Sequence, residues 1–449
     1  METDLLINEF FPLKNLLPPE NLRPFIGSRA GLVKQIIQNG IEPDEAHLFH
    51  LSVVTSNASI LLQQPSLDIR AAGSGSTYRE AFGCAVGEVV ERSALASYDK
   101  KAIVRGSYRE LSQRGVEVLS PEQLDLFSKE QYTNSDFLFE PFTDTAELGW
   151  TEGVNLLTGK PVLVPAQAVL MSYKPFPGEA FITYSTTSGC ACATSMESAI
   201  IKCVYEQVER DAVMLTWLTK TSPPGVDAEK IVSAALLKKL NMQNNSATDV
   251  YDLRYLSYGI DIPVFLGILQ RKIAGKKRLL IGAAANLCAQ AASEKALLET
   301  AQSIPFLKLI LASNPNPDFA GISFNDFEKN LRYYADERNQ HHLTFLQENN
   351  DVFATEKLPD HKSRTTEENL TFILKTLKRN NLTPIAIDHG NAEYRDLGFH
   401  VLRVFIPELL QLYTPNAPFL GNRRMHSVLG KLGKQETVND LNLLPHPMP

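Results

Sequence analysis

The chain has 449 residues, 44% of them hydrophobic and 21% charged, so it is long enough for one large domain or two ordinary ones. Its formal net charge is -7 and its sequence pI is about 5.8, and it lacks the clustered lysines and arginines of a nucleic-acid-binding surface. No apolar run reaches the roughly 18 residues of a membrane-spanning helix, and the acidic start lacks the positive charge of a targeting signal. These features predict a soluble, cytoplasmic protein with no nucleic-acid or membrane partner.

The five cysteines are an odd number in a long chain without a signal, which favours reduced thiols over a disulfide framework. Cys190 and Cys192 form the only close pair in the sequence. A zinc site needs further Cys or His ligands at typical spacing, and none is near these two. We therefore expect Cys190 and Cys192 to be small buried side chains rather than metal ligands.

Hydrophobic patterning predicts the elements of the first half of the chain. Residues 31–37 predict a short helix, and the alternation of apolar and polar residues over 48–62 predicts strands. A Gly-rich turn at residues 73–77 leads into a helix that ends near residue 97. Residues 161–171 and 181–184 have β character.

A long run over residues 195–217 repeats apolar residues at helical spacing, without Gly or Pro, and predicts an amphipathic helix that ends before residues 221–225. A strand hairpin over 262–284 and a long helix over 292–311, kinked at Pro305, should follow. The polar stretch 341–368 is expected to be a flexible insertion. Helix, strand, helix and strand then alternate over residues 368–379, 383–388, 392–397 and 400–406.

These elements predict a single α+β domain with mixed sheets. We expect it to span residues 1–430, with motifs from residue 66 onward, and to be followed by a Pro-rich tail of residues 431–449.

Two of the predicted helices carry the sequence Glu-x-x-Glu-Arg. Glu206 and Glu209 lie one turn apart in the central helix, and Glu88 and Glu91 have the same spacing after the Gly-rich turn. Four carboxylates brought together repel one another unless cations lie between them, and Mg²⁺ takes oxygen ligands, usually together with nucleotide phosphates. The alternative is that each triplet is a solvated helix face with an internal ion pair to its arginine.

Three blocks of the chain resemble motifs of the YcaO superfamily, and they occur in family order over residues 73–407. The chain contains no Gly-x-x-x-x-Gly-Lys-Ser/Thr loop, so it does not resemble P-loop enzymes. The blocks are Gly73-Ser74-Gly75-Ser76-Thr77 with Glu80, Cys84, Glu88, Glu91 and Arg92; Thr187-Ser188-Gly189-Cys190-Ala191 with Glu206, Glu209, Arg210 and Asp211; and Asp388 with Gly398, Val401, Arg403 and Pro407.

The resemblance implies a YcaO-like fold in which two carboxylate-bearing helices flank an ATP site. It also implies that Glu88, Glu91, Glu206 and Glu209 hold Mg²⁺, and that Arg403 is a catalytic residue that adds positive charge to the phosphoryl group in transit. The nucleotide-binding residues implied by position are Cys84, Glu88, Glu91, Thr194, Ser198, Lys202, Glu206, Glu209 and Arg403.

Some of these positions depart from the family's pattern. Cys84 stands where the family commonly has Ser, and Thr194, Ser198 and Lys202 stand where it has Asn, Glu and Gln. Ser198 therefore lacks a carboxylate that would contact a metal. Lys202 lies one turn before Glu206, with the charge to pair with it or to contact phosphate.

The chain ends in Pro445-His446-Pro447-Met448-Pro449, which is similar to the end of the azoline-forming cyclodehydratases in the superfamily. Alternating prolines favour an extended polyproline conformation of about 3.1 Å per residue. The resemblance implies that the tail enters the active site and that the terminal carboxylate of Pro449 acts as a general base. The alternative is an unordered chain end.

The resemblance thus implies an ATP-dependent cyclodehydratase of the D-protein type. Such an enzyme converts Cys, Ser or Thr of a ribosomally made precursor peptide to thiazoline or oxazoline by phosphorylating the backbone amide oxygen. The implied partners are the precursor peptide, a separate leader-peptide-binding protein, a flavin dehydrogenase and a second copy of the chain. Thioamide or macroamidine formation is the alternative activity, and a catalytically degenerate scaffold, supported by the departures at Thr194, Ser198 and Lys202, is the alternative class.

Overall fold

The computed structural model describes residues 25–27, 31–41, 45–56, 71–242, 249–313, 327–361, 365–414, 416–434 and 440–448. Its helices and strands are, in chain order, β1 (Val33–Gln38), β2 (Phe49–Thr55), β3 (Ala71–Gly75), α3 (Tyr78–Leu95), β4 (Val104–Gly106), α4 (Tyr108–Gln113), α5 (Lys129–Thr133), β5 (Leu148–Asn155), β6 (Pro161–Pro165), α6 (Ala166–Val169), β7 (Cys190–Ala193), α7 (Met196–Leu218), α8 (Ala228–Ile231), α9 (Ala234–Lys239), β8 (Asp249–Leu256), β9 (Val264–Ile273), β10 (Lys276–Ala285), α10 (Ala289–Ser313), α11 (Phe327–Ala335), the 3₁₀ stretch η6 (Glu337–Gln347), α12 (Thr366–Arg379), β11 (Ile385–Asp388), α13 (Ala392–Asp396), β12 (His400–Phe405) and α14 (Arg423–Lys431).

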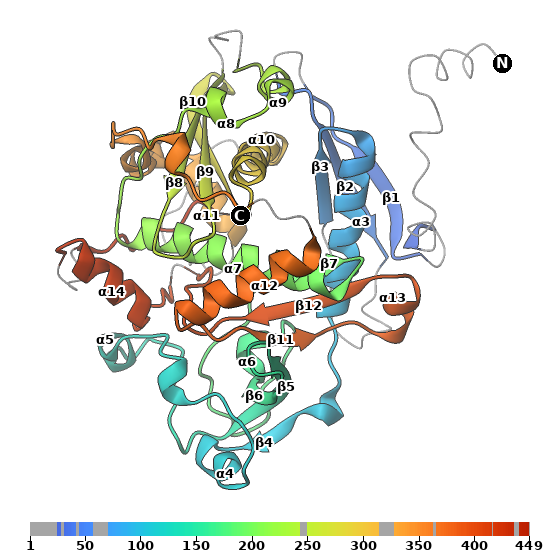
Figure 1. The fold of residues 1–449 in the computed structure, drawn as a ribbon, viewed down its shortest axis with the longest axis vertical. Coiled ribbons are helices and arrows are strands. Elements are labelled where there is room, and N and C mark those ends of the chain that lie inside the picture. Colours follow the sequence, from blue (N-terminus) through green and yellow to red (C-terminus); the bar gives the residue numbers. More distant parts are fainter. Residues whose placement is uncertain are drawn as a thin grey trace.

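The strands form three antiparallel sheets around one central helix (Figure 1). One sheet has the order β1-β2-β3, a second has the order β10-β9-β8, and the largest has the order β4-β5-β11-β12-β7, with β6 paired to β5. In Figure 1 the β1–β3 sheet lies beside α3, the β8–β10 sheet lies beside α10, and the largest sheet fills the lower half. This arrangement confirms the predicted α+β class.

Helix α7 forms the centre of the molecule because it is covered on opposite faces. Leu402 and Val404 of β12 belong to the same buried cluster as the apolar residues of α7, and so do Leu266 of β9 and Ile281 of β10. The helix begins where the hydroxyl of Ser195 accepts a hydrogen bond from the N–H of Ser198. Its carboxylates are therefore carried into the interior of the protein.

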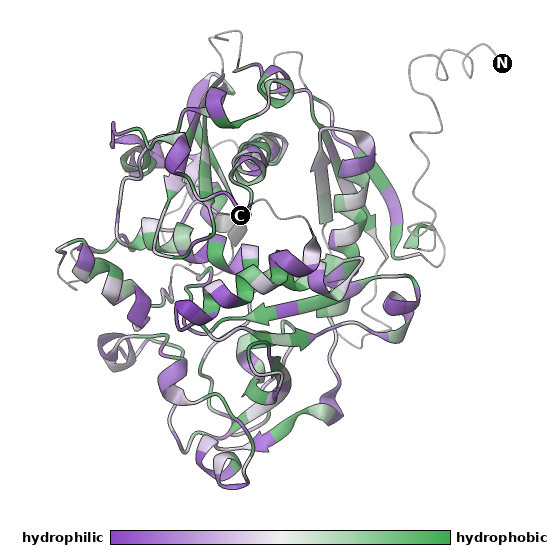
Figure 2. Ribbon diagram, in the orientation of Figure 1, coloured by the Kyte–Doolittle hydropathy of each residue, from purple (hydrophilic) through white to green (hydrophobic). Residues whose placement is uncertain are grey.

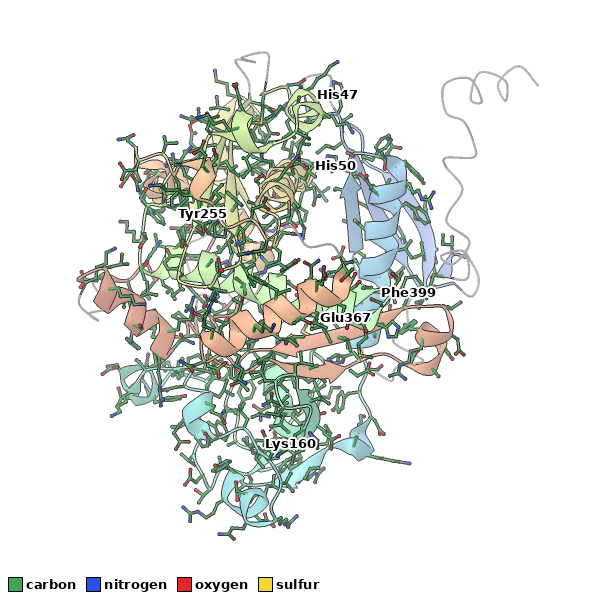
Figure 3. The ribbon with its side chains drawn as sticks, in the orientation of Figure 1. His47, His50, Lys160, Tyr255, Glu367 and Phe399 are labelled. Carbon is green, nitrogen blue, oxygen red and sulfur yellow. The ribbon has the colours of Figure 1, made fainter. Side chains whose placement is uncertain are left out.

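Helix α3 is fixed by its first turn and by close packing on β3. Thr77 and Glu80 form a capping box, which satisfies backbone N–H groups at the start of the helix. A Cβ atom at Gly73 would lie 2.1 Å from the backbone oxygen of Ala81, so only glycine lets β3 approach the helix so closely. Phe399, labelled in Figure 3, belongs to the cluster that covers the buried face of α3.

Helix α10 continues through Pro305 and packs on the face of β9 and β10 opposite to α7. Two glycines allow this contact. A Cβ at Gly267 would lie 2.5 Å from Oγ1 of Thr300, and one at Gly282 would lie 2.4 Å from its backbone nitrogen. This close approach brings the first half of α10 near α7 at the edge strand β10.

Most of the predicted helices and strands are confirmed, including α3, α7, the β9–β10 hairpin and the closing α12, β11, α13 and β12. The helix predicted over residues 31–37 is wrong, because Val33–Gln38 pairs with β2 as strand β1. Isoleucines at positions 36 and 37 suit a strand as well as a helix, and the pairing with β2 decides between them.

Three further predictions need correction. The strand expected over 161–171 stops at Pro165, the residue before α6, and residues 181–184 do not belong to a strand. The stretch expected to be a flexible insertion includes most of η6, which buries Leu343, Phe345 and Leu346. A few apolar side chains are enough to anchor a segment whose average composition is polar.

Figure 2 shows hydrophobic residues along β11 and β12 and many hydrophilic residues on α12 and α14. In α12 only Ile373, Thr376 and Leu377 are buried, so this helix contributes one narrow face to the core. Among the residues that the structure describes, no helix combines the length and apolarity needed to cross a membrane.

Candidate active site

Glu91 of α3, which interacts with Glu88 on the same helix, approaches Glu206 of α7. Burial raises the pKa of Glu91 to about 8, and the negative charges of Glu206 and Glu88 push it in the same direction. Burial also raises the pKa of Glu206. The interaction of Glu91 with Glu206 thus links the two Glu-x-x-Glu pairs, and we call Glu88, Glu91, Glu206 and Glu209 the acidic cluster.

Arg210 is the cation nearest to the α7 carboxylates. It lies 3.5 Å from Oε1 of Glu206 and 3.4 Å from Oε1 of Glu209. Burial still raises the pKa of Glu209 to about 8, because the lowering by Arg210 is opposed by the nearby carboxylate of Glu299. One guanidinium thus does not neutralise the cluster.

Helix α10 adds two residues that the sequence did not identify. Nζ of Lys295 lies 3.2 Å from Oε1 of Glu299, and both charges act on Glu206 and Glu209. The negative charges around Lys295, Glu299 foremost, raise the pKa of its ammonium group. An i,i+4 Lys–Glu pair is common on helix surfaces, so the sequence contained no signal that set this one apart.

The carboxylates of α3 are also held by the open edges of two strands. Oε2 of Glu88 accepts a hydrogen bond from the N–H of Ala72 at 2.9 Å, and Oε1 accepts one from Nε of Arg92 at 2.8 Å. The N–H of Cys192 donates to Glu91. Backbone donors on β3 and β7 thus orient both side chains toward the space between α3 and α7.

This donor set fits Mg²⁺ in its chemistry. The carboxylates are hard oxygen donors, and burial, together with neighbouring negative charges, raises the pKa values of Glu91 and Glu209. Within the described residues, no three His, Cys, Asp or Glu side chains are close enough to form a metal site by themselves. Mg²⁺ usually keeps several waters and binds one or two carboxylates together with substrate phosphates, so a site of this kind does not need three protein ligands close together.

Four other predicted residues lie around the cluster rather than in it. Cys84 is exposed on α3, where the charges of Lys202, Lys295 and Glu88 act on its thiol, and Thr194 is exposed between β7 and α7. The hydroxyl of Ser198 accepts a hydrogen bond from Ser195 at 3.0 Å. Nζ of Lys202 donates to the backbone oxygen of Cys192 at 3.3 Å.

Arg403 is fully buried on β12, opposite Cys190 of β7. Its guanidinium donates to the carbonyl oxygens of Val169 at 3.1 Å and Thr186 at 2.9 Å, and also to Ser185 and Gln411. All of these acceptors are uncharged, and burial lowers the pKa of Arg403. A phosphate would reach Arg403 only after some of these bonds were exchanged.

The tail follows α7 back toward the acidic cluster. The N–H of Asn442 donates to the carbonyl of Leu218 at the end of α7, and Nε1 of Trp217 donates to the carbonyl of Leu444, at 2.8 and 2.9 Å. Further along, Pro447 lines a small apolar cavity with residues of α7, among them Val213.

Residues 445–448 of the tail are buried. The carbonyl of Pro445 accepts a hydrogen bond from the hydroxyl of Tyr334 at 2.5 Å, and Nε2 of His446 lies 2.9 Å from the carbonyl oxygen of Tyr413. His446 is also close enough to Arg210 for the guanidinium to lower its pKa. Pro449, the predicted general base, lies outside the described residues.

A groove of 320 Å³ lies on the β5–β6 hairpin, away from the acidic cluster. Its lining includes Glu117, Glu152 and Lys160, and Lys160 is labelled in the lower part of Figure 3. None of the residues predicted for nucleotide or metal binding contributes to it.

Comparison with known proteins identifies the family of this chain. A family model described as a YcaO cyclodehydratase that binds ATP and Mg²⁺ matches residues 72–410. The chain belongs to the YcaO family. This membership confirms the resemblance seen in the sequence, and it confirms at the level of the family that the protein is an ATP-dependent enzyme that uses Mg²⁺.

Three solved structures share the YcaO fold with this chain. A heterocyclase in complex with substrate and cofactor has a TM-score of 0.77 and 21% identity, over 96% of this chain and 56% of that one. YcaO from Methanopyrus kandleri, bound with AMPPCP and Mg²⁺, has a TM-score of 0.58 and 20% identity, over 84% and 86%. A chain of the E. coli microcin synthetase McbBCD complex has a TM-score of 0.63 and 14% identity, over 94% and 98%. The present chain thus spans about half the length of the first heterocyclase.

Proposed function

We propose that this YcaO protein is an ATP-dependent cyclodehydratase that forms thiazoline or oxazoline rings in a ribosomally made peptide. The observation that carries this proposal is the position of the tail. Its residues 445–448 are buried along α7, and His446 lies near Arg210. Arg210 also contacts Glu206 and Glu209. A Pro-rich tail that approaches the acidic cluster supports a reaction in which the tail takes part.

In the proposed reaction, a Cys, Ser or Thr side chain of the peptide loses its proton and attacks the carbonyl carbon of the preceding residue. The carbonyl oxygen becomes an oxyanion, which forms a bond to the γ-phosphorus of ATP while ADP leaves. Phosphate then departs with the electron pair of the C–O bond, and the amide nitrogen loses its proton to form the C=N bond. The peptide loses one water per ring, and ATP becomes ADP and phosphate.

We assign the holding of Mg²⁺ to Glu88, Glu91, Glu206 and Glu209, four carboxylates of the acidic cluster. Burial raises the pKa of Glu91, Glu206 and Glu209, and a bound cation would offset this cost of their negative charge. When bound, the ion neutralises phosphate charge. Lys295 adds a fixed positive charge from α10. The carboxylate of Pro449 would accept a proton from the peptide.

We propose that Arg403 acts by holding neighbouring residues in place rather than by contacting phosphate. Its bonds to Ser185 and Thr186 hold the segment before β7, which carries the second motif. We also propose that Cys84, Thr194, Ser198 and Lys202, which lie around the acidic cluster, contact the bound nucleotide.

We further propose a separate leader-peptide-binding protein and a flavin dehydrogenase as partners, a homodimer, and a cytoplasmic location. The similarity to 98% of one chain of the McbBCD complex supports the idea of a partner protein. All five cysteines are free thiols, which fits a reducing compartment.

Two alternatives remain within reach of the same geometry. Thioamide or macroamidine formation would use the same ATP site with a different nucleophile, and product mass separates it from cyclisation. The second alternative is a degenerate scaffold, in which the acidic cluster would not turn over ATP. Thr194, Ser198 and Lys202 support the scaffold only weakly, because the carboxylates of Glu91 and Glu209 are in place without them.

The test is intact mass spectrometry of Cys-, Ser- and Thr-rich precursor peptides incubated with this protein, the partner encoded beside it, and Mg-ATP. A loss of about 18 Da per ring, the mass of one water, with equal release of phosphate is expected for ATP-driven removal of the amide oxygen. A gain of about 16 Da, the difference between sulfur and oxygen, would identify a thioamide instead. No mass change and no phosphate release would favour the scaffold.

A further inference from the structure

His446 makes a specific contact that the proposed role of the tail does not use. Its side chain is fully buried, and its ring meets that of Tyr413 edge-on, with centroids 5.4 Å apart at 87°. The Nε2 atom faces the carbonyl oxygen of Tyr413 at 2.9 Å. A carbonyl oxygen only accepts hydrogen bonds, so Nε2 must carry a proton to donate to Tyr413.

The groups around His446 keep it neutral. Burial lowers its pKa to about 4, and the Arg210 guanidinium on α7 acts in the same direction. Tyr413 beside it and Tyr334 on α11 are phenols whose pKa values are raised by burial, so they are also uncharged at neutral pH. His446 therefore acts as a hydrogen-bond donor rather than as a cation.

The tail has few other ways to fix its position. Proline has no N–H, so Pro445 and Pro447 contribute only carbonyl oxygens, and Met448 has no polar side-chain group of comparable strength. Trp217 and Tyr334 donate to carbonyls before His446, at Leu444 and Pro445. Within residues 445–448, His446 supplies the side-chain donor.

An extended Pro-rich segment rises about 3.1 Å per residue and has no internal hydrogen bonds. It can therefore slide along an apolar surface by one residue without breaking any hydrogen bond within itself. A slip of that size would move the end of the chain by more than the length of a hydrogen bond, which is enough to remove a general base from its proton.

We propose that His446 is a positioning residue that fixes the register of the tail along α7 by donating its Nε2 proton to the carbonyl of Tyr413. The consequence for turnover rests on the function proposed above, in which the tail's carboxylate acts as a base. The structural part does not, because the seating of the tail can be measured without any reaction.

Three substitutions test this inference. In His446→Gln the amide nitrogen lies near the position of Nε2 and still donates, whereas His446→Leu fills the space without a donor. His426→Leu is the matched control, because Nε2 of His426 also contacts a backbone carbonyl, that of Leu420 at 2.9 Å, but lies on α14 outside the tail. Loss of stability alone would affect His446→Leu and His426→Leu alike.

Seating is measured by the fluorescence of Trp217, whose indole N–H contacts the tail directly. The chain has two tryptophans, so a Trp150→Phe background leaves Trp217 as the sole emitter. His446→Leu is expected to shift the emission toward that of a chain truncated after Leu444, whereas His446→Gln and His426→Leu should match the parent. Wild-type emission from His446→Leu, or equal shifts from His446→Leu and His446→Gln, would overturn the inference.

Turnover is measured as phosphate release from Mg-ATP with the precursor peptide and partner of the first experiment. His446→Leu should lower kcat by about tenfold, the worth of one buried hydrogen bond, and leave the KM for ATP unchanged, while His446→Gln restores kcat. An unchanged kcat in His446→Leu would overturn the inference and leave the cyclodehydratase standing. If the wild type releases no phosphate, the proposed function fails and the emission of Trp217 still decides the register role.

Discussion

At the scale of single residues, the acidic cluster is defined by a shortage of positive charge. Glu91 and Glu209 both have pKa values near 8 because they are buried beside other carboxylates. Arg210 and Lys295 reduce this effect without removing it. Burial and the neighbouring charges therefore favour the protonated form of Glu91 and Glu209 at neutral pH.

Glu206→Gln is expected to abolish turnover of Mg-ATP and to leave the melting temperature within a few degrees of the wild type. The substitution removes an anionic oxygen ligand, but it also relieves repulsion with Glu91, whose pKa the charge of Glu206 raises. Phosphate release and thermal unfolding measure the two effects. Glu197→Gln, an exposed change in the first turn of the same helix, is the control and should be active. A fully active Glu206→Gln enzyme would remove Glu206 from the metal site.

The pH dependence of stability follows from the same two carboxylates. A group with a pKa of 4.5 in the unfolded chain and about 8 in the folded protein binds more protons when folded. The free energy of unfolding should therefore fall as the pH rises from 4.5 to about 8, through the contribution of these groups. Mg²⁺ binding should release protons in this window and should restore the melting temperature most on its alkaline side.

Calorimetry of Mg²⁺ binding in two buffers of different ionisation enthalpy measures the proton release, and melting curves with and without Mg²⁺ measure the stability. Binding heats that do not depend on the buffer would contradict the raised pKa values of Glu91 and Glu209.

At the scale of elements, the site depends on how closely strands and helices approach each other. The open edges of β3 and β7 supply the N–H groups that orient Glu88 and Glu91. The glycines of β9 and β10 bring α10 close enough for Lys295 and Glu299 to act on α7. Position in the sheet, rather than the helix sequence alone, thus determines the charges around the cluster.

Gly282→Ala is expected to displace α10 and to raise the KM for ATP severalfold, because the new Cβ would lie 2.4 Å from the backbone nitrogen of Thr300. Stability should fall by about 1–3 kcal/mol, the usual penalty of overpacking. Steady-state kinetics and thermal unfolding measure both effects. Gly430→Ala in α14 meets no atom within 4 Å and serves as the control, which should be at least as stable as the wild type. An unchanged KM in Gly282→Ala would show that the position of α10 is unimportant for ATP.

At the scale of the whole molecule, α7 joins the sheets and the tail closes over its second half. Asp211 contributes to this closure, since its carboxylate accepts hydrogen bonds from the N–H of Leu410 and from Nε of Arg424 on α14. The helix that carries Glu206 and Glu209 is thus connected to the segments before the tail. Tail and acidic cluster should respond to each other through α7.

Deletion of residues 445–449 is expected to abolish cyclisation and to increase hydrogen exchange in the second half of α7. The reason is that α7 loses the cover of Pro447, which lies against Val213, Thr216 and Trp217, while Tyr334 loses its carbonyl partner on Pro445. Mass spectrometry of exchanged peptides measures this locally, and exchange in α3, which the tail does not contact in the described residues, is the internal control. Protection of α7 equal to that of the full chain would contradict the observed seat of the tail.

The sequence by itself determined the features that depend on local patterns. The apolar spacing of α7, the Gly-rich turn before α3 and the repeated Glu-x-x-Glu-Arg triplets were enough to predict both helices and their four carboxylates. The Pro-rich tail was equally visible, because prolines impose their conformation without help from distant residues. Where local propensity was ambiguous, as in β1, strand pairing decided the outcome and the prediction was wrong.

Tertiary structure alone decided which distant groups meet. Lys295 and Glu299 belong to an ordinary ion pair in the sequence, and they enter the site only because α10 crosses β10 at Gly282. The burial of Arg403 among neutral acceptors and the contact of His446 with Tyr413 likewise depend on segments far apart in the chain. Such contacts follow from packing in three dimensions, in which neighbours are set by the sheet order and not by sequence spacing.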